Sequence, residues 1–200
     1  MAFSRRQLLQ RSAVAGVFLA LSSNPVLAQL ARAPRLIPWR NWSGAQTCLP
    51  LARLAPKDLD ELVQMIRQAP STIRPVGSAH SFSALVPTDG TLLSLSYFNG
   101  LLDHDPATLQ ATFAAGTPMS RMGPALKAVG QALPNMADID YQTLAGAIST
   151  STHGTGVGFT SYSGCVTGLQ LVTAQGAVLD CDAQRHPELF SAARVSLGAL

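Results

Sequence analysis

Hydrophobic and polar positions alternate with two different periods along this 200-residue chain. Between Pro56 and Pro70 the apolar residues recur at helical spacing, and acidic residues crowd the first turn, so this stretch predicts a helix. Helical spacing and helix-start signals predict further helices over residues 119–129, 144–148 and 187–194.

Short apolar runs that end at glycine or proline predict strands. They fall over residues 73–76, 91–95 and 109–115, and a hairpin is predicted from 169–173 and 177–179. Hairpins and helices are mixed along the chain and do not alternate strictly. The order therefore favours an α+β fold over a doubly wound sheet.

Two loops of small residues lie between these elements. Gly77–Ser81 follows a predicted strand, and Ser149–Gly158 follows a predicted helix. Each is open to a structural interpretation, as a tight turn or a mobile surface loop. Small residues also let backbone N–H groups converge on an anion, so two such loops together favour an extended, phosphate-bearing cofactor. Neither loop has the Walker lysine or the Gly-x-Gly-x-x-Gly spacing.

The first 28 residues have the composition of an export signal. Arg5 and Arg6 precede two leucines and an apolar run, and Val26-Leu27-Ala28 predicts cleavage after Ala28. The apolar run is shorter than the roughly 20 residues of a membrane span. The paired arginines resemble a twin-arginine signal, which predicts a folded protein exported to the periplasm; an ordinary secretory signal is the alternative. Residues 29–37 predict a linker.

The chain's net positive charge comes from this signal. The net charge of +3 comes from 14 basic and 11 acidic residues, and the signal holds three arginines and no acid. The remainder is neutral, without the clustered lysines and arginines that phosphate backbones require, which argues against a nucleic-acid partner. With 47% hydrophobic and 12% charged residues, the chain is not of the disordered class.

Cysteine and histidine positions exclude other kinds of chemistry. The spacing of Cys48, Cys165 and Cys181 matches no zinc pattern, so they predict free or buried thiols. His80 and His153 lie in the two loops without further ligands at metal-binding spacing, so no metal site is expected. No Gly-x-Ser-x-Gly elbow supports serine hydrolysis. His104 and His186 lie in turn-like, solvated contexts, and no role is assigned to them.

Five segments in order resemble the vanillyl-alcohol oxidase superfamily of flavoproteins, which carry a PCMH-type FAD-binding domain. Residues 74–83 with Thr88-Asp89-Gly90 resemble its pyrophosphate loop, residues 114–117 a strand end beside the flavin, and residues 145–156 a second flavin-contacting segment. Residues 41–44 and 193–200 narrow the resemblance to the sugar-acting branch, the aldonolactone and alditol oxidases.

The resemblance implies a fold and a cofactor site. The fold is an α+β, PCMH-type lobe of two α+β subdomains over residues 38–200, with FAD stretched between the subdomains. The implied cofactor-binding residues are Val76, Gly77, Ser78, Ala79, His80, Ser81, Phe82, Gly116, Gly146, Ser149, Thr150, Thr152, His153 and Gly154.

The resemblance also assigns a covalent link. In this branch a histidine of the pyrophosphate loop is commonly bonded to the flavin 8α-methyl group, and His80 occupies that place. Such a bond raises the flavin potential, which favours taking hydride from an alcohol carbon. No cysteine occupies the second loop, so a doubly linked flavin is not expected. Ser151 stands where many relatives have glycine. The resemblance therefore does not decide whether dioxygen can reach the flavin at this position.

The implied activity is oxidation of a CH–OH group in a sugar-derived lactone, such as L-gulono- or D-arabinono-1,4-lactone, or in a polyol. Electrons would pass to dioxygen or another acceptor. Family members continue into a substrate-binding domain that carries the general base. We expect that domain to be missing here, and therefore no catalytic residue within the 200 residues. The alternatives are a truncated FAD-binding module without turnover and an exported binding domain, for example one that binds polysaccharide through Trp39 and Trp42.

Overall fold

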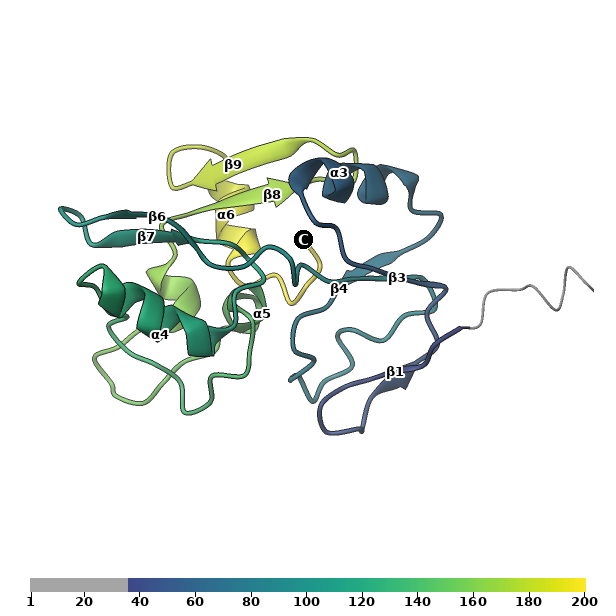
Figure 1. Ribbon diagram of the computed structural model, residues 1–200, viewed down its shortest axis with the longest axis horizontal. Coiled ribbons are helices and arrows are strands. Elements are labelled where there is room, and N and C mark those ends of the chain that lie inside the picture. Colours follow the sequence, from purple (N-terminus) through teal and green to yellow (C-terminus); the bar gives the residue numbers. More distant parts are fainter. Residues whose placement is uncertain (1–35) are drawn as a thin grey trace, which may run out of the picture. The chain divides into compact units, whose positions relative to one another are not determined.

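Three short parallel strands form the sheet nearest the start of the described chain, which is residues 36–200 of the computed structural model (Figure 1). The strand order is β3 (Ala52–Leu54), β5 (Thr91–Leu93), β4 (Ile73–Pro75). Leu92 and Leu93 of the central strand are almost fully buried. An antiparallel pair, β1 (Trp39–Arg40) with β2 (Thr47–Cys48), precedes this sheet. The predicted signal, residues 1–28, and linker residues 29–35 lie outside the described residues.

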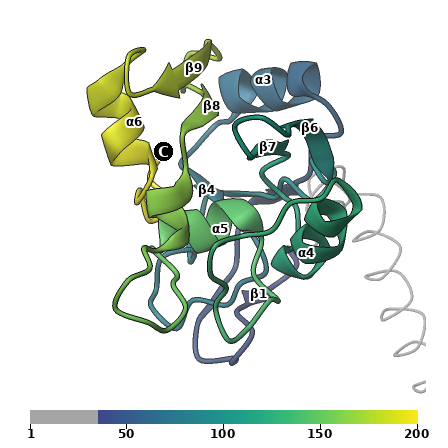
Figure 2. The same ribbon diagram turned by 90° about the vertical axis from the view of Figure 1, so that its left-hand side faces the viewer.

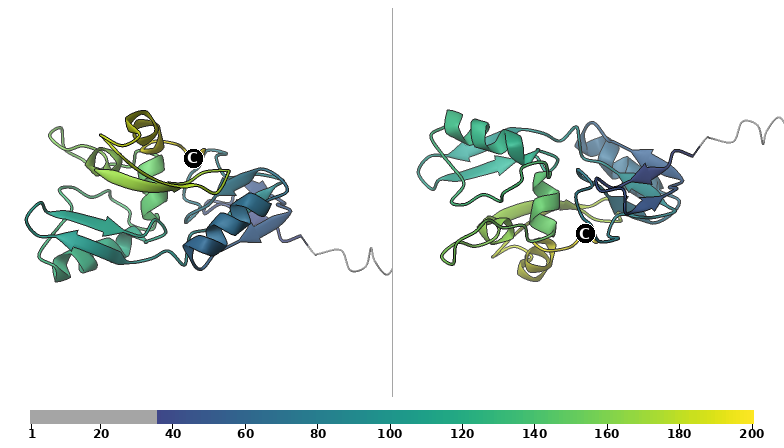
Figure 3. Two further views of the ribbon diagram at one scale, coloured as in Figure 1. Left: turned by 90° about the horizontal axis from the view of Figure 1, so that it is seen from above. Right: turned by 90° about the horizontal axis from the view of Figure 1, so that it is seen from below.

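Helix α3 (Leu59–Gln68) begins where the sequence supplies an N-cap. The Asp58 carboxylate accepts a hydrogen bond of 2.8 Å from the backbone N–H of Glu61, which satisfies one of the free donors at the helix start. Leu62 is the buried residue of the apolar face. The helix lies beside the parallel sheet when the molecule is viewed from above (Figure 3).

Later elements are antiparallel pairs and short helices. Strands β6 (Leu101–Asp105) and β7 (Gln110–Phe113) form one pair, and β8 (Gly168–Val172) and β9 (Val178–Asp182) form another. The helices are α4 (Met119–Ala128), α5 (Leu144–Ser149), a 3₁₀ turn (Tyr162–Cys165) and α6 (Pro187–Ala193). Figure 2 shows α4 beside the β6–β7 pair, with α5 next to it.

The core of this second group surrounds α5. Met119, Met122, Ala147 and Tyr162 are buried together, and Phe113 of β7 packs against them. The Tyr162 hydroxyl accepts a hydrogen bond of 2.7 Å from the backbone N–H of Ala137. The start of α4, the middle of α5 and the 3₁₀ turn are therefore fixed to one another, and the loop that follows α5 begins from a rigid base.

The β8–β9 turn connects the later strands with α3. The Arg67 guanidinium donates a hydrogen bond of 2.9 Å from Nε to the carbonyl of Gln175. Gly176 has a φ of +72°, a backbone conformation that favours glycine, and a Cβ there would displace the Arg67 side chain. Residues 37–200 form one compact unit.

The mixed α and β architecture with several small sheets agrees with the α+β prediction, and the division into two subdomains stays a prediction. The predicted helices and the hairpin are confirmed, with ends that differ by at most three residues. The turn-like assignment of His104 is wrong, since it lies on β6 opposite Ala111, although it is exposed as expected. Between residues 36 and 200, no helix has both the length and the apolarity needed to cross a bilayer.

Candidate functional site

A large cleft of about 2760 Å³ opens between the loop after β4 and the elements around α5. Its walls include Val76–Phe82, Gly116, the start of α5, strand β8 and the last residues of the described chain. Pockets for drug-sized ligands are commonly about 300–1,000 Å³, so this cleft has room for a longer molecule. It joins the first predicted loop to part of the second.

The first loop, residues 76–82, lies entirely along the cleft. It leaves the sheet with a hydrogen bond of 2.9 Å from the N–H of Val76 to the carbonyl of Leu93. Ala79 then takes a φ of +59°, in the left-handed region that non-glycine residues seldom adopt. The backbone N–H groups of residues 77–81 have no acceptor among residues 36–200, so they are available to an anionic ligand.

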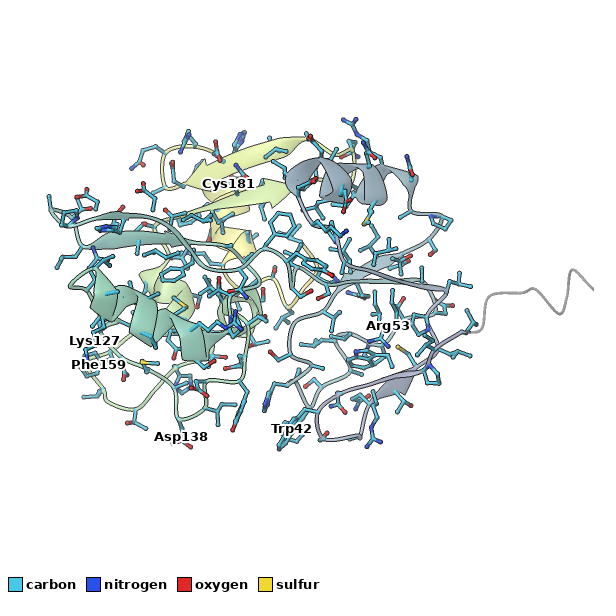
Figure 4. The ribbon with its side chains drawn as sticks, viewed as in Figure 1. Trp42, Arg53, Lys127, Asp138, Phe159 and Cys181 are labelled. Atoms are coloured by element: carbon cyan, nitrogen blue, oxygen red, sulfur yellow. The ribbon has the colours of Figure 1, made fainter. Side chains whose placement is uncertain are left out.

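The turn between β1 and β2 holds this loop from outside. Asn41 is 3% exposed; its amide donates to the carbonyl of Ser81 at 2.9 Å and its oxygen accepts from the N–H of Gln46 at 3.0 Å. The Gln46 side chain donates to the carbonyl of Phe82 at 3.2 Å. Trp42, shown in Figure 4, donates its backbone N–H to the carbonyl of Ala79 at 2.9 Å. The strained loop is thus held at three carbonyls, those of Ala79, Ser81 and Phe82.

His80 lies between two aromatic rings. Its imidazole stacks on Trp42 with ring centres 4.8 Å apart and on Tyr141 with ring centres 6.0 Å apart, and both pairs are close to parallel. The Nε2 atom of His80 is buried and has no hydrogen-bond partner among residues 36–200. Because a buried polar atom without a partner costs free energy, this nitrogen is suited to a ligand that supplies the missing contact.

The second loop reaches the cleft only through its first residues. Gly146, Ser149 and Thr150 line the cleft. The Thr150 hydroxyl donates to the carbonyl of Gly146 at 2.9 Å. On the adjoining wall, Gly116 donates to the carbonyl of Phe98 at 2.9 Å, and a Cβ there would overlap the backbone at Leu95. Close backbone approach therefore requires glycine at that position.

Thr152, His153 and Gly154 do not line the cleft. The Thr152 hydroxyl accepts a hydrogen bond of 2.8 Å from the Gln142 amide. His153 is exposed, and its Nδ1 lies 2.9 Å from the carbonyl of Gly154. A Cβ on Gly154 would overlap the carbonyl of Met136. Thr152 and Gly154 therefore contact neighbouring segments, whereas His153 contacts only the next residue. The cofactor role that the resemblance gives these three residues stays a prediction.

Gln142 is a site residue that the sequence interpretation missed. It lines the cleft, and its Oε1 atom is buried without a hydrogen-bond partner in the described part of the chain. Its position just before Thr143 and the start of α5, next to a predicted flavin-contacting segment, is the signal that could have identified it. Gln142 and His80 thus bring two unsatisfied polar atoms to one cleft.

Charges play little part in this cleft. Asp180 and Arg185 are the charged pair on its β9 side, 3.9 Å apart and both largely exposed. Nearby, the Asp182 carboxylate accepts hydrogen bonds from the backbone N–H and the side chain of Arg185, which lower its pKa to about 2. In residues 36–200, no three histidine, cysteine or acidic side chains are grouped so that they could hold a metal ion.

The arrangement fits a long, polar cofactor with a planar end. A loop of free N–H groups suits a pyrophosphate, while the unsatisfied nitrogen of His80 and oxygen of Gln142 suit a heteroaromatic ring with donors and acceptors. Of the residues predicted to hold the cofactor, residues 76–82, Gly116, Gly146, Ser149 and Thr150 line the cleft, and they offer chiefly backbone groups and small side chains.

Comparison with known protein families identifies the class. The family described as FAD binding domain matches residues 50–182, which is more than half of the chain. The chain belongs to this family, and its cofactor is FAD. The matched range includes the first loop, Gly116, α5 and the second loop.

Individual relatives are enzymes that act on aldonolactones. The chain is 40% identical over 165 residues to L-gulono-1,4-lactone dehydrogenase of Mycobacterium tuberculosis, covering 81% of this chain and 38% of that protein. It is 32% identical over 204 residues to a putative D-arabinono-1,4-lactone oxidase of Neurospora crassa, covering 91% and 37%. It is 32% identical over 167 residues to L-gulonolactone oxidase of Bos taurus, covering 82% and 38%. The chain therefore spans little more than a third of the length of these relatives.

Trp39 and Trp42 do not form a joint aromatic surface. Trp39 is 5% exposed and belongs to the core, whereas Trp42 is 65% exposed and stacks on His80. The polysaccharide-binding alternative needs both rings at a surface, so the burial of Trp39 contradicts it.

Proposed function

We propose that this protein is an FAD-dependent oxidoreductase that oxidises a CH–OH group of a sugar-derived lactone, with dioxygen or another acceptor taking the electrons. The observation that carries the proposal is the unpartnered, buried Nε2 of His80 at the cleft, in a chain similar to aldonolactone oxidases and dehydrogenases. L-gulono- and D-arabinono-1,4-lactone are the first substrates to test, and polyols are the second class.

Each wall of the cleft would contact a different part of the cofactor. The free N–H groups of residues 77–81 would bind the pyrophosphate, and Gly116 and Gly146 would allow close approach of the backbone. Gln142 would supply its amide oxygen to a donor on the cofactor. Bound FAD supplies the two-electron chemistry, which amino-acid side chains lack.

We further propose a covalent link at His80. An imidazole nitrogen would bond to the 8α carbon of the flavin, while one C–H bond at that carbon and the imidazole N–H bond break. The two protons and two electrons released would reduce dioxygen to hydrogen peroxide. His80 is suited to this role because its Nε2 has no competing hydrogen bond within residues 36–200.

The test is activity and flavin content of the full-length protein produced with flavin available. Lactone-dependent reduction of an artificial electron acceptor and oxygen uptake are measured side by side with both lactones and with a polyol. Turnover of a lactone supports the proposal and the acceptor comparison separates oxidase from dehydrogenase. Bound flavin without turnover of any of these compounds would favour a binding module, and a protein isolated without flavin would reject the proposal.

Export is a separate proposal. The Arg5-Arg6 pair supports delivery to the periplasm by the twin-arginine route, in which a protein crosses the membrane already folded. Replacing both arginines with lysine keeps the charge and should leave the precursor in the cytoplasm, as followed by fractionation and immunoblotting. Arg11→Lys is the matched control and should be exported. Continued export of the double variant would favour an ordinary secretory signal.

A further inference from the structure

We propose that Trp42 and Tyr141 form an aromatic clamp that holds the His80 imidazole in one plane beside the cleft. The clamp is defined as these three rings. It rests on the proposed covalent function of His80 and assigns two positioning residues to it. Neither Trp42 nor Tyr141 is among the cofactor-binding residues implied by the family resemblance.

The geometry of the clamp restricts the imidazole on both faces. The Trp42 and His80 rings are inclined by 18°, and the His80 and Tyr141 rings by 12°. Parallel aromatic rings at such separations attract each other and resist rotation of the ring between them. Partial rotation about the Cβ–Cγ bond of His80 would tilt the ring out of both stacks, so the clamp holds the imidazole in one plane.

The clamp is anchored to the backbone that carries His80. The backbone N–H of Trp42 donates to the carbonyl of Ala79, the residue before His80, so the backbone of Trp42 is held beside the backbone that carries the imidazole. Phe82 meets the indole edge-on, with ring centres 6.1 Å apart, and limits its movement on another side. Buried Asn41, the residue before Trp42, bonds to the carbonyl of Ser81.

Tyr141 completes the clamp from a different part of the chain. It precedes Gln142, whose amide bonds to the Thr152 hydroxyl and whose Oε1 is the other unsatisfied atom at the cleft. Tyr141 is 71% exposed and Trp42 is 65% exposed, so neither ring is needed to fill a core. Exposed aromatic rings that bury one face on a histidine are better explained by positioning that histidine than by packing.

The clamp predicts how flavin attachment responds to loss of either ring. In the full chain produced with flavin, Trp42→Ala and Tyr141→Ala should each lower the acid-stable flavin fraction by about 2- to 10-fold, the range expected for losing one aromatic pair. Total bound FAD should change little. Trp42→Phe and Tyr141→Phe should restore attachment because they keep a ring. Phe159→Ala is the matched control: Phe159 is 57% exposed, is not part of the cleft wall, and lies far from Trp42 (Figure 4).

A second measurement tests the clamp without relying on the covalent bond. The ring protons of His80, identified by their disappearance in His80→Ala, should be shifted upfield in NMR spectra by the flanking rings and should move downfield in Trp42→Ala and Tyr141→Ala. If the alanine variants attach flavin as the wild type does, the clamp is rejected while the covalent proposal stands. If the wild type carries only flavin that acid releases, the covalent proposal fails. If it carries no flavin, the flavin proposal fails. Ring protons of His80 without an upfield shift would reject the clamp itself.

Discussion

The two small-residue loops look alike in sequence and differ in their surroundings. Each carries one histidine, and each has one non-glycine residue in the left-handed region, Ala79 with a φ of 59° and Ser151 with a φ of 53°. His80 stacks between two rings with a buried, unpartnered nitrogen, whereas His153 is exposed and its ring lies against the carbonyl of Gly154. The neighbours supplied by distant segments, and not the composition of the loop, therefore determine which histidine is stacked beside the cleft.

The largest expected effect separates the two histidines. His80→Ala removes the nitrogen proposed to bond the cofactor and should abolish acid-stable flavin. His153→Ala should keep most of it, because His153 does not line the cleft. Fluorescence of acid-treated gel bands under ultraviolet light measures both variants. Equal loss in the two variants would contradict the distinction between the loops.

Alanine substitutions at two glycines should affect different properties, the stability of the fold in one case and FAD binding in the other. A Cβ on Gly154 would overlap the backbone carbonyl of Met136, so Gly154→Ala should lower the free energy of unfolding by about 1–3 kcal/mol, a typical cost of overpacking. A Cβ on Gly77 would meet the Thr143 hydroxyl, so Gly77→Ala should displace the first loop and lower bound FAD. Thermal denaturation and flavin absorbance measure the two effects.

The control for the glycine pair is a second substitution. Thr143→Ala removes the atom that a Cβ on Gly77 would meet, so adding it to Gly77→Ala should recover flavin binding. No side-chain change can rescue Gly154→Ala, because the obstructing atom is backbone. If the Thr143 substitution gives no recovery, contact between Gly77 and Thr143 is not what places the first loop.

Two asparagines offer a smaller, matched comparison. Asn41 is buried and joins the first loop to the β1–β2 turn, while half-buried Asn135 donates to the carbonyl of Thr155 at 2.9 Å in the second loop. Asn41→Ala should cost about 1–3 kcal/mol of unfolding free energy, since it leaves the partly buried carbonyl of Ser81 and N–H of Gln46 unpaired. It should also reduce acid-stable flavin. Asn135→Ala should cost less and leave attachment largely intact, as thermal denaturation and gel fluorescence would show.

Much of the fold was predictable because local signals agree with packing. In α3, the Asp58 cap, the acidic first turn and buried Leu62 all point to one helix. Strand β6 was missed because its sequence, Leu-Leu-Asp-His-Asp, is mostly exposed and shows no buried face. Its conformation comes from pairing with β7, a non-local interaction that periodicity does not report. The β1–β2 pair, two residues on each strand, is too short to give a pattern.

The two loops of the candidate site could be predicted from the sequence, but the side chains that surround them in the fold could not. Small residues marked both loops, and every proposed residue of the first loop lines the cleft. The aromatic clamp joins Trp42, His80 and Tyr141, which are far apart along the chain, so no local pattern could place them together. Gln142 was missed for a similar reason, because an amide becomes a site residue only when folding buries it without a partner.

The smallest expected effect concerns the left-handed residues themselves. A non-glycine residue in this region costs roughly 1–2 kcal/mol, and glycine relieves that cost but adds entropy to the unfolded chain. Ala79→Gly loses only a methyl group, so it should raise the melting temperature slightly. Ser151→Gly also loses a hydroxyl that lies 3.3 Å from the Ser163 hydroxyl, and should therefore gain less or nothing. A larger gain in Ser151→Gly, measured by thermal denaturation, would show that the second loop stores more strain than the first.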